Sequence, residues 1–442
     1  MSKKVQPFKA FFYNQDRIPA LKDVVSPPYD VISPEIQDEL YAKSPYNFCR
    51  VDYTKEEGTL RYEVAKKTFS AWLSEQILVQ DKEPGLYFHF HTFVLPDGKT
   101  VTRKGFFAVR RIEDFSEGSI KPHEKTLDGP KQDRLNLMRA THMQLSPVFS
   151  LYSDPEFAIF KRVEKNLKTT PFMDFTTDEG ERHQIWKIKD AATADFLNSF
   201  LSEKPLFIAD GHHRYETALN YRNEILAKHP DLPDNAGVRH ILMYFSNMDD
   251  EGLIILPIHR ALHSLQEFDL DGFLSKLSTL FTVRETHGAD TGTLTAELAA
   301  LGKNHHAFLL LTKDQNRSYL IFIERDKWLT SEFVSQIPAE LAGLDVTVLH
   351  RHILEEILGI SEESQARQEN IIYFKSTDTA IAETREGHCD LTFILNPTRI
   401  TDMRDVAGAG YKMPQKSTFF YPKIVSGLFL HDVSAKGLDH GS

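Results

Sequence analysis

The stretch PLFIADGHHRYETALNYR, residues 205–222, joins an apolar run to an acid, a glycine, two histidines and an arginine. The apolar residues before Asp210 are typical of a buried strand, and the pattern after the histidines predicts an amphipathic helix. Gly211 lets the backbone approach a ligand closely, and the first N–H groups of a helix carry partial positive charge. The stretch therefore predicts a strand-to-helix junction that could bind an anion, above all a phosphate.

The polar side chains of this junction are candidates for catalysis. Arg214 can bind two oxygens at once, and His212 and His213 can donate hydrogen bonds or transfer protons. Asp210 could cap the helix, orient an imidazole or bind magnesium. A simple strand-helix corner with solvated side chains is the alternative, but the unbroken run of polar and glycine positions favours a site.

Composition restricts the classes of protein to consider. The 442 residues are 41% hydrophobic and 26% charged, with a formal net charge of −11, so the chain can form a large core divided into two or three domains. The acidic balance argues against nucleic-acid binding.

Cys49 and Cys389 are far apart, which favours a reducing compartment over a disulfide scaffold. No segment resembles a signal peptide or a membrane span, so we expect a cytoplasmic protein without a membrane partner.

The expected fold is α/β, of the mixed α+β kind, in three regions. Residues 1–117 should form an N-terminal α/β domain. Residues 118–262 should form the core that contains the DGHHR motif. Residues 263–442 should form a C-terminal α/β region that contains the MPQKST motif.

Hydrophobic patterns give the expected elements. Residues 46–53 read as a strand, residues 61–78 as a helix, and the segments on either side of residues 96–98 as a hairpin. Residues 164–195 are polar and should be peripheral. Residues 266–328 should alternate in the order helix, strand, helix, strand, strand.

A second candidate site lies in IKPHEKTLDGPKQDR, residues 120–134, where Glu124 stands among cations. A carboxylate so placed could take a proton from a hydroxyl group while the cations hold phosphate oxygens. A salt-bridged surface loop is equally compatible with the composition. The candidates for phosphate binding beside Glu124 are Lys125, Thr126, Lys131 and Arg134.

A third candidate lies in MPQKSTFFYPK, residues 413–423. Lys416, Ser417 and Thr418 resemble a turn that grips phosphate, and Lys423 adds a second cation. The segment is not a P-loop, because GxxxxGK[ST] is absent.

Two further patterns are weaker. Tyr29 and Asp30 follow a double proline that stiffens the chain, so they are candidates for substrate binding or part of a rigid turn. His89 and His91 lie on one face of an expected strand. Without an evident third ligand, ordinary histidines are favoured there over a metal site.

Six segments together resemble a known family. SPPYDVIS, PYNFCRVD, IKPHEKTLDGPKQDR, ADGHHRYETAL, LDVTVLH and MPQKSTFFYPKIVSGL occur in this order. They look like the family called domain-of-unknown-function 1015, over nearly the whole chain. This resemblance implies no activity.

A more distant resemblance does imply an activity. KPHEKT, SPVFSLYSD and PLFIADGHHRYETAL are similar in layout to the free-serine kinases of the ParB and sulfiredoxin-like superfamily. The resemblance implies a ParB-like catalytic core within 118–262, with Glu124 as the base and residues 210–214 on the phosphate side. Lys125 stands where the smaller kinases have a second acid, and the insertion between the paired strands is long.

The residues and this resemblance together predict a phosphotransferase that moves a phosphoryl group to or from a small hydroxyl compound. The resemblance implies that this compound is L-serine, which would become O-phosphoserine. The expected donor is pyrophosphate, ATP or ADP, with Mg²⁺ as the expected cofactor. A phosphatase or nucleotide hydrolase with the same site is one alternative. A non-catalytic sensor of phosphometabolites or nucleotides is another.

Overall fold

The structure is a computed structural model. It describes residues 3–124, 128–286, 290–313 and 317–434. The chain divides into two compact units, each formed by segments distant in sequence. The first unit comprises residues 1–122, 126–254 and 422–442, and the second comprises residues 123–125 and 255–421. Both units contain helices and strands, so the predicted mixed α/β class is confirmed.

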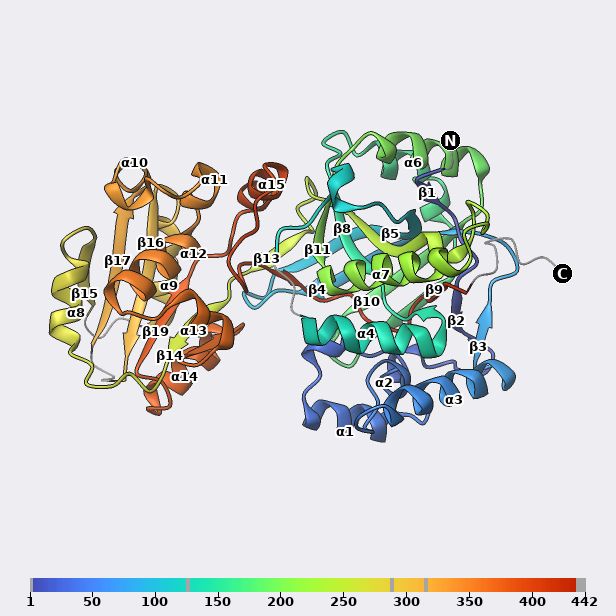
Figure 1. The fold of residues 1–442 in the computed structure, drawn as a ribbon, viewed down its shortest axis with the longest axis horizontal. Helices are drawn as coiled ribbons and strands as arrows, with labels where there is room; N and C mark the ends of the chain where they lie inside the picture. The colour runs from blue at the N-terminus through green and yellow to red at the C-terminus, as the bar shows by residue number, and fades with distance from the viewer. Residues whose placement is uncertain (1–2, 125–127, 287–289, 314–316, 435–442) are drawn as a thin grey trace. The chain divides into compact units, whose positions relative to one another are not determined.

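The first unit is built on a large mixed sheet (Figure 1). Its strands are β1 (Val5–Gln6), β4 (Leu86–Val94), β5 (Thr100–Arg111), β6 (Ile120–Lys121), β8 (Val148–Tyr152), β9 (Met173–Thr176), β10 (Arg182–Ile188), β11 (Leu206–Asp210) and β12 (His240–Asn247). Their order is β6-β11-β8-β12-β5-β4-β10-β9, and β1 also pairs with β5. β6 runs parallel to β11 and β8 parallel to β12, whereas the other pairs are antiparallel.

Shorter elements complete the first unit. Two small antiparallel pairs join β2 (Phe11–Tyr13) to β3 (Leu78–Gln80) and β7 (Met143–Gln144) to β21 (His431–Asp432). The helices are α1 (Pro34–Lys43), α2 (Cys49–Asp52), α3 (Leu60–Ser74), α4 (Asp128–Thr141), α5 (Ala158–Val163), α6 (Ala191–Ser202) and α7 (His212–Lys228). Short 3₁₀ turns occupy Leu21–Asp23, Tyr29–Val31, Phe115–Glu117, Asn166–Lys168 and Gly237–Arg239.

Successive side chains of a strand point to opposite faces of the sheet, so the first unit has two buried layers, one on each face. One face carries Phe88, Phe106 and Phe245, and the rings of Phe106 and Phe245 stack at 4.9 Å. Apolar side chains of α4, α6 and α7 belong to the same core. This layer fixes α7, and with it the helix N-terminus predicted to bind an anion.

The opposite face buries charged and ring side chains. Arg103 on β5 is fully buried and donates hydrogen bonds to the carbonyl oxygen of Pro422 (2.8 Å) and to Nδ1 of His91 (3.0 Å). Burial lowers the pKa of His91, and the charge of Arg103 lowers it further, so the ring is neutral. Since Nδ1 accepts from Arg103, the proton is on Nε2, which donates to Glu181 at 2.8 Å. A chain of hydrogen bonds thus connects a buried cation to a carboxyl group.

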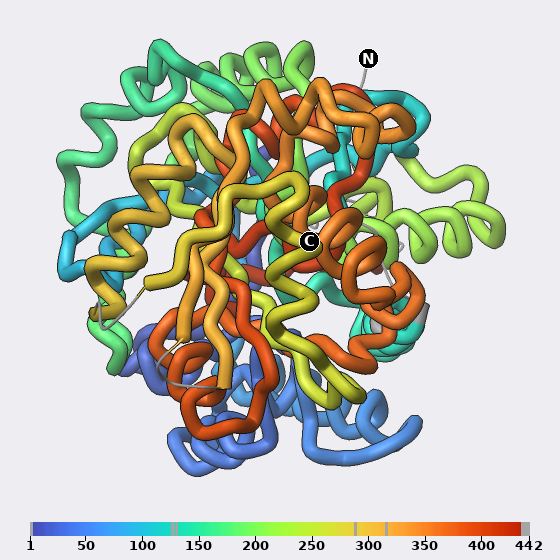
Figure 2. The backbone as a smooth tube through the Cα atoms, turned by 90° about the vertical axis from the view of Figure 1, so that its left-hand side faces the viewer, coloured from blue at the N-terminus to red at the C-terminus, as the bar shows by residue number. Residues whose placement is uncertain are grey.

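The second unit contains an antiparallel sheet ordered β15-β17-β16-β19-β14-β18, whose strands lie side by side in Figure 2. The strands of this unit are β14 (His259–Leu262), β15 (Thr282–Thr286), β16 (His305–Thr312), β17 (Ser318–Glu324), β18 (Ile371–Phe374), β19 (Leu391–Leu395) and β20 (Phe419–Tyr421). A further strand, β13 (Ile254–Leu256), begins at the last residue of the first unit before this one. β13 and β20 pair separately. Leu294 and Leu298 of the helix 291–301 pack on one face of the large sheet with Leu309 and Ile394.

The helices of the second unit include one of unusual type. They are α8 (Leu270–Leu277), α9 (Thr291–Leu301), α10 (Arg325–Leu329), α11 (Ala339–Ala342), α12 (Asp345–Thr347), α13 (Glu362–Arg367), α14 (Thr377–Arg385) and α15 (Ile400–Gly408). A 3₁₀ turn covers Glu332–Val334, and a π-helix covers Val348–Ile357. Within the described residues, no helix is both long and apolar enough to cross a bilayer.

Some expected elements are found and others are not. The hairpin across residues 96–98 and the element order within 266–328 are confirmed. The strand expected over 46–53 is wrong. The short helix α2 forms there, because the side chain of Asn47 accepts from the Cys49 N–H (3.1 Å) and donates to the carbonyl oxygen of Asp23 (2.9 Å).

The expectation that residues 164–195 are peripheral is also wrong. β9 and β10 lie at one edge of the first sheet, and His183 and Ile185 are fully buried. The polar residues of these strands occupy alternate positions, whose side chains point outward. Strands from residues 1–117 and 118–262 share this sheet.

The buried chain from Arg103 to Glu181 predicts a pH-dependent stability. Burial raises the pKa of Glu181 from 4.5 to about 7, although Arg103 opposes the shift. Between these values the folded state binds more protons than the unfolded state. The free energy of unfolding should therefore fall by about 1–3 kcal/mol as the pH rises through this window. Urea unfolding from pH 4.5 to 8 should show this fall in the native protein and lose it in Glu181→Gln.

The exposed Glu203, which is not among the charges that act on Glu181, supplies the control. Glu203→Gln should keep the native pH dependence of the unfolding free energy. Identical pH profiles for Glu181→Gln and the native protein would contradict the assignment of a raised pKa to Glu181.

Candidate functional site

The strand-to-helix junction forms as predicted. β11 ends at Asp210, after an irregularity in its pairing with β8 between Ile208 and Asp210. Gly211 follows at φ +88°, and α7 begins at His212. The backbone conformation favours glycine, and a Cβ at Gly211 would lie 2.8 Å from Nε of Arg214, so a larger residue would displace the Arg214 side chain.

Asp210, Arg214 and Lys423 form the Asp210 cluster. Oδ2 of Asp210 accepts from Nη2 of Arg214, and Oδ1 accepts from Nζ of Lys423. Arg214 also donates to the carbonyl oxygen of Pro147. The three charged side chains are 12–17% exposed, so their charges are poorly screened by water. The cluster has two cations and one anion, and hence a formal excess of one positive charge.

The two cations dominate the ionisation of Asp210. Burial by itself would raise the pKa of this carboxyl group, but the charges of Lys423 and Arg214 hold the pKa below its ordinary value. Asp210 is therefore ionised at neutral pH and keeps both cations in place. Gly211 has no side chain with which to cap α7, and the first turn of this helix contains no acid. The N–H groups at the start of α7 add to the attraction of the two cations for an anion.

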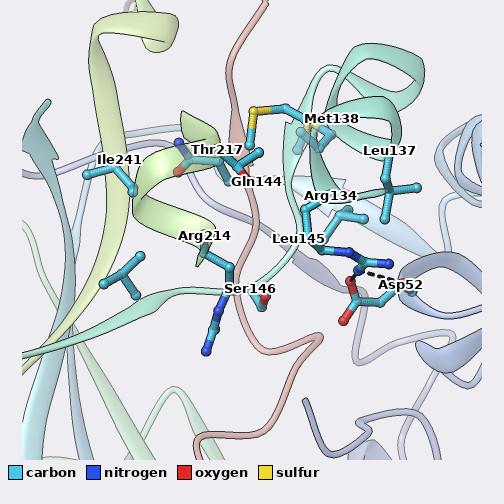
Figure 3. A pocket seen from close by; sticks show the side chains of 12 residues that line it. Asp52, Arg134, Leu137, Met138, Gln144, Leu145, Ser146, Arg214, Thr217 and Ile241 are labelled. Carbon is cyan, nitrogen blue, oxygen red and sulfur yellow. Dashed lines mark hydrogen bonds and ion pairs between the residues drawn. The ribbon is translucent and has the colours of Figure 1, made fainter. Parts of the chain in front are cut away.

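A small cavity of about 40 Å³ lies beside the cluster (Figure 3). Arg214 from α7, Arg134 from α4 and Asp52 from α2 line it. Arg134 donates to Oδ1 of Asp52 at 3.0 Å and to Oδ2 of Asp133 at 2.6 Å. Its guanidinium group lies 4.1 Å from the centre of the Tyr29 ring. The cavity thus contains two guanidinium groups and a buried carboxylate.

The other predicted residues of the first unit have varied positions. Tyr29 is partly buried beneath Arg134, whereas Asp30 is exposed. Lys131 on α4 forms an ion pair with Glu216 on α7, at 3.1 Å from Nζ to Oε2. His212 is buried and His213 is partly exposed in the first turn of α7.

Glu124 belongs to the second unit, and so does the MPQKST turn. The N–H of Met413 donates to the carbonyl oxygen of His123 at 2.8 Å, and the N–H of Lys416 donates to Oε1 of Glu124 at 3.3 Å. Oγ1 of Thr418 lies 3.0 Å from Nε2 of His123. The turn therefore holds the segment that carries the predicted base.

The remaining predictions for this region concern four residues. Ser417 is buried and donates to the carbonyl oxygen of Pro414 at 2.6 Å, so its hydroxyl proton is used within the turn. The side chain of Lys416 is exposed, and its backbone has φ +58°. Lys125 and Thr126, predicted to bind phosphate, lie outside the described residues.

The histidines expected to be ordinary have acidic and imidazole neighbours. His91, Glu181 and His183 offer ligand atoms within 4.8 Å of one another. Nε2 of His91 carries a proton for Glu181, however, and the rings of His91 and His183 stack at 4.1 Å. Metal ligation requires a bare nitrogen aimed at the ion. The hydrogen-bond chain accounts for His91 and Glu181, whereas Nε2 of His183 is buried without a hydrogen-bond partner among the described residues.

Sequence reasoning missed Asp52 and the pairing between Asp210 and Lys423. Asp52 lies in CRVDY, and the apolar residues beside it are the sequence feature that could have indicated its burial. Lys423 was singled out as a cation, but its partner lies more than two hundred residues away in sequence.

A double-mutant cycle measures the pairing of Asp210 with Lys423. Asp210→Asn, Lys423→Met and the double variant should show a coupling energy of about 1–3 kcal/mol in urea unfolding, because each single change leaves a partly buried charge with fewer partners. Lys228→Met, in an exposed lysine near the other end of α7, is the control and should show no coupling with Asp210→Asn. Additive effects of Asp210→Asn and Lys423→Met would contradict the ion pair.

Solved structures with an overlapping fold include three of unlike descriptions. A conserved hypothetical protein from Pyrococcus furiosus is 14% identical, with a TM-score of 0.33, covering 73% of this chain and 95% of its own. A free serine kinase in complex with AMP is 13% identical, with a TM-score of 0.34, covering 73% and 92%. SbnI with a C-terminal truncation, from Staphylococcus aureus, is 8% identical, with a TM-score of 0.34, covering 76% and 90%. Similarities at this level assign no activity.

The sequence comparisons identify the family. No curated protein matches the chain. A family model matches residues 5–347, which include the KPHEKT and DGHHR motifs but not the MPQKST turn. The chain belongs to the family described as "Protein of unknown function (DUF1015)".

Proposed function

We propose that this protein is a phosphotransferase that moves a phosphoryl group to the side-chain hydroxyl of L-serine, forming O-phosphoserine. The observation that carries the proposal is the Asp210 cluster at the start of α7. Phosphoryl transfer depends mainly on positioning and on neutralising the charge of the phosphoryl oxygens. Arg214, Lys423 and the N–H groups of α7 supply both.

Asp210 has a positioning role in this proposal. Both of its oxygens are occupied by cations, so its placement does not fit a magnesium ligand. The carboxylate instead fixes Arg214 and Lys423 beside the start of α7, where their positive charges would attract a phosphate. His212 and His213, at the same helix start, would add donors to the phosphoryl oxygens.

Glu124 is the proposed base. In the reaction, the serine oxygen forms a bond to phosphorus, the bond from phosphorus to the donor oxygen breaks, and the hydroxyl proton passes to Glu124. The Glu124 carboxylate, whose Oε1 accepts from the Lys416 N–H, would take that proton. The role of Glu124 is supported by these local contacts and by the likeness of KPHEKT to the serine-kinase motif.

The donor is pyrophosphate, ATP or ADP in this proposal. A cluster with one excess positive charge and a helix N-terminus is suited to a compact, highly charged group. Mg²⁺ would arrive with the donor, since it commonly binds through substrate phosphates and few protein groups.

Replacing the proposed base tests the reaction. Glu124→Gln should lower phosphoserine formation by about 100-fold or more, because the amide cannot accept the proton. The affinity for pyrophosphate, measured by calorimetry, should change little. Glu156→Gln, at an exposed glutamate of the first unit, is the matched control and should retain full turnover. Unchanged turnover in Glu124→Gln would exclude Glu124 as the base.

A further inference from the structure

The second unit has a cavity that the proposed phosphotransfer does not use. Its volume is about 470 Å³, within the range of pockets that hold small organic molecules. Its walls come from the π-helix (Val348–Ile357), from α11 and the residues before it, from α13, and from the segment 410–415.

The π-helix is the first sign that the cavity is functional. The N–H of Leu358 donates to the carbonyl oxygen of Ile353 at 3.1 Å, one residue further than in an α-helix. Such wide turns are rare and frequently occur at functional sites. This helix contains the end of the LDVTVLH motif, which phosphoryl transfer leaves unexplained. It places His350, Arg351 and Glu355 in the wall.

A buried hydroxyl group is the second sign. Thr347 lines the cavity and is only 4% exposed, and its Oγ1 has no hydrogen-bond partner among the described residues. Buried polar atoms are nearly always paired, because leaving one unpaired is costly. A ligand in the cavity would supply the missing partner.

The charges of the wall indicate an uncharged ligand. Arg351 pairs with Glu355 at 3.0 Å and with Glu362 at 3.7 Å, so its charge is balanced within the wall. Burial lowers the pKa of His350 to about 3, and the charge of Arg260 contributes, so the ring is neutral. With Lys412, the formal charges of the lining sum to zero: two cations and two anions. A phosphate would gain little here.

The remaining lining favours a flat ring with polar edges. Tyr373 and Tyr411 offer aromatic surfaces, and the Tyr411 side chain is 40% exposed. Arg260 lies 5.4 Å from the centre of the Tyr373 ring and holds it in place. The amides of Gln336 and Gln415 each offer a donor and an acceptor.

We propose that this cavity binds an uncharged planar heterocycle of nucleoside size, with its ring against the tyrosines and a polar edge hydrogen-bonded to Thr347. One wall of the site is the segment 410–415, which continues into the turn that holds Glu124. The site is distinct from the Asp210 cluster, and its ligand does not depend on the proposed phosphoryl transfer.

Calorimetric titration of the full chain with adenosine tests the proposal. The native protein should bind adenosine in a saturable manner. Leu341→Trp, which puts a larger side chain into the cavity, should weaken binding at least about tenfold. Thr347→Val, which removes only the hydroxyl group, should weaken it about fivefold. Leu329→Trp, at an exposed leucine outside the lining, is the control and should bind normally.

The absence of saturable binding by the native protein would overturn the proposal, and so would equal binding by Leu341→Trp or by Thr347→Val. If Leu341→Trp does not fold, the nearly isosteric Thr347→Val decides alone. Arg214→Ala should leave adenosine binding unchanged. Unchanged binding would show that adenosine does not bind at the Asp210 cluster. A loss of binding in Arg214→Ala would place adenosine at that cluster instead.

Discussion

The ion pairs of Asp210 are the constraint on which the candidate site depends. A single carboxylate at the end of β11 binds Arg214 of α7 and Lys423 of the C-terminal segment. Two partly buried cations repel each other without an intervening anion, so Asp210 makes their proximity possible. Gly211 then lets the chain turn directly from the strand into the helix without filling the space beside Arg214.

The core of the first unit supports this arrangement from two sides. The phenylalanine layer fixes α7 on one face of the sheet. On the other face, Arg103 binds the carbonyl oxygen of Pro422, the residue directly before Lys423. The buried cation that contributes to the pH dependence of the core therefore also positions a cation of the site. Pro422 and Lys423 therefore take part both in the packing of the core and in the proposed anion site.

Much of the site could be predicted from the sequence because its residues are contiguous. An apolar run followed by DGHHR determines a strand, a glycine turn and a helix start, and these need only local information. The pairing of Lys423 with Asp210 could not be predicted, because it depends on where the C-terminal segment lies against the sheet. A short helix likewise forms where a strand was predicted, because Asn47 makes hydrogen bonds to a distant loop. The peripheral reading of residues 164–195 failed because an edge strand can be polar on alternate residues and buried on the others.

The central claim is direct transfer of a phosphoryl group to serine. The most direct measurement is phosphorus NMR of the protein with Mg²⁺ and L-serine that carries ¹⁸O in its hydroxyl group, supplied in parallel with pyrophosphate, ATP or ADP. The account predicts a phosphoserine signal with the isotope shift of a bridging ¹⁸O with at least one donor. Release of inorganic phosphate without phosphoserine would contradict the account and favour a hydrolase, and unchanged spectra with all three donors would contradict it in favour of a sensor.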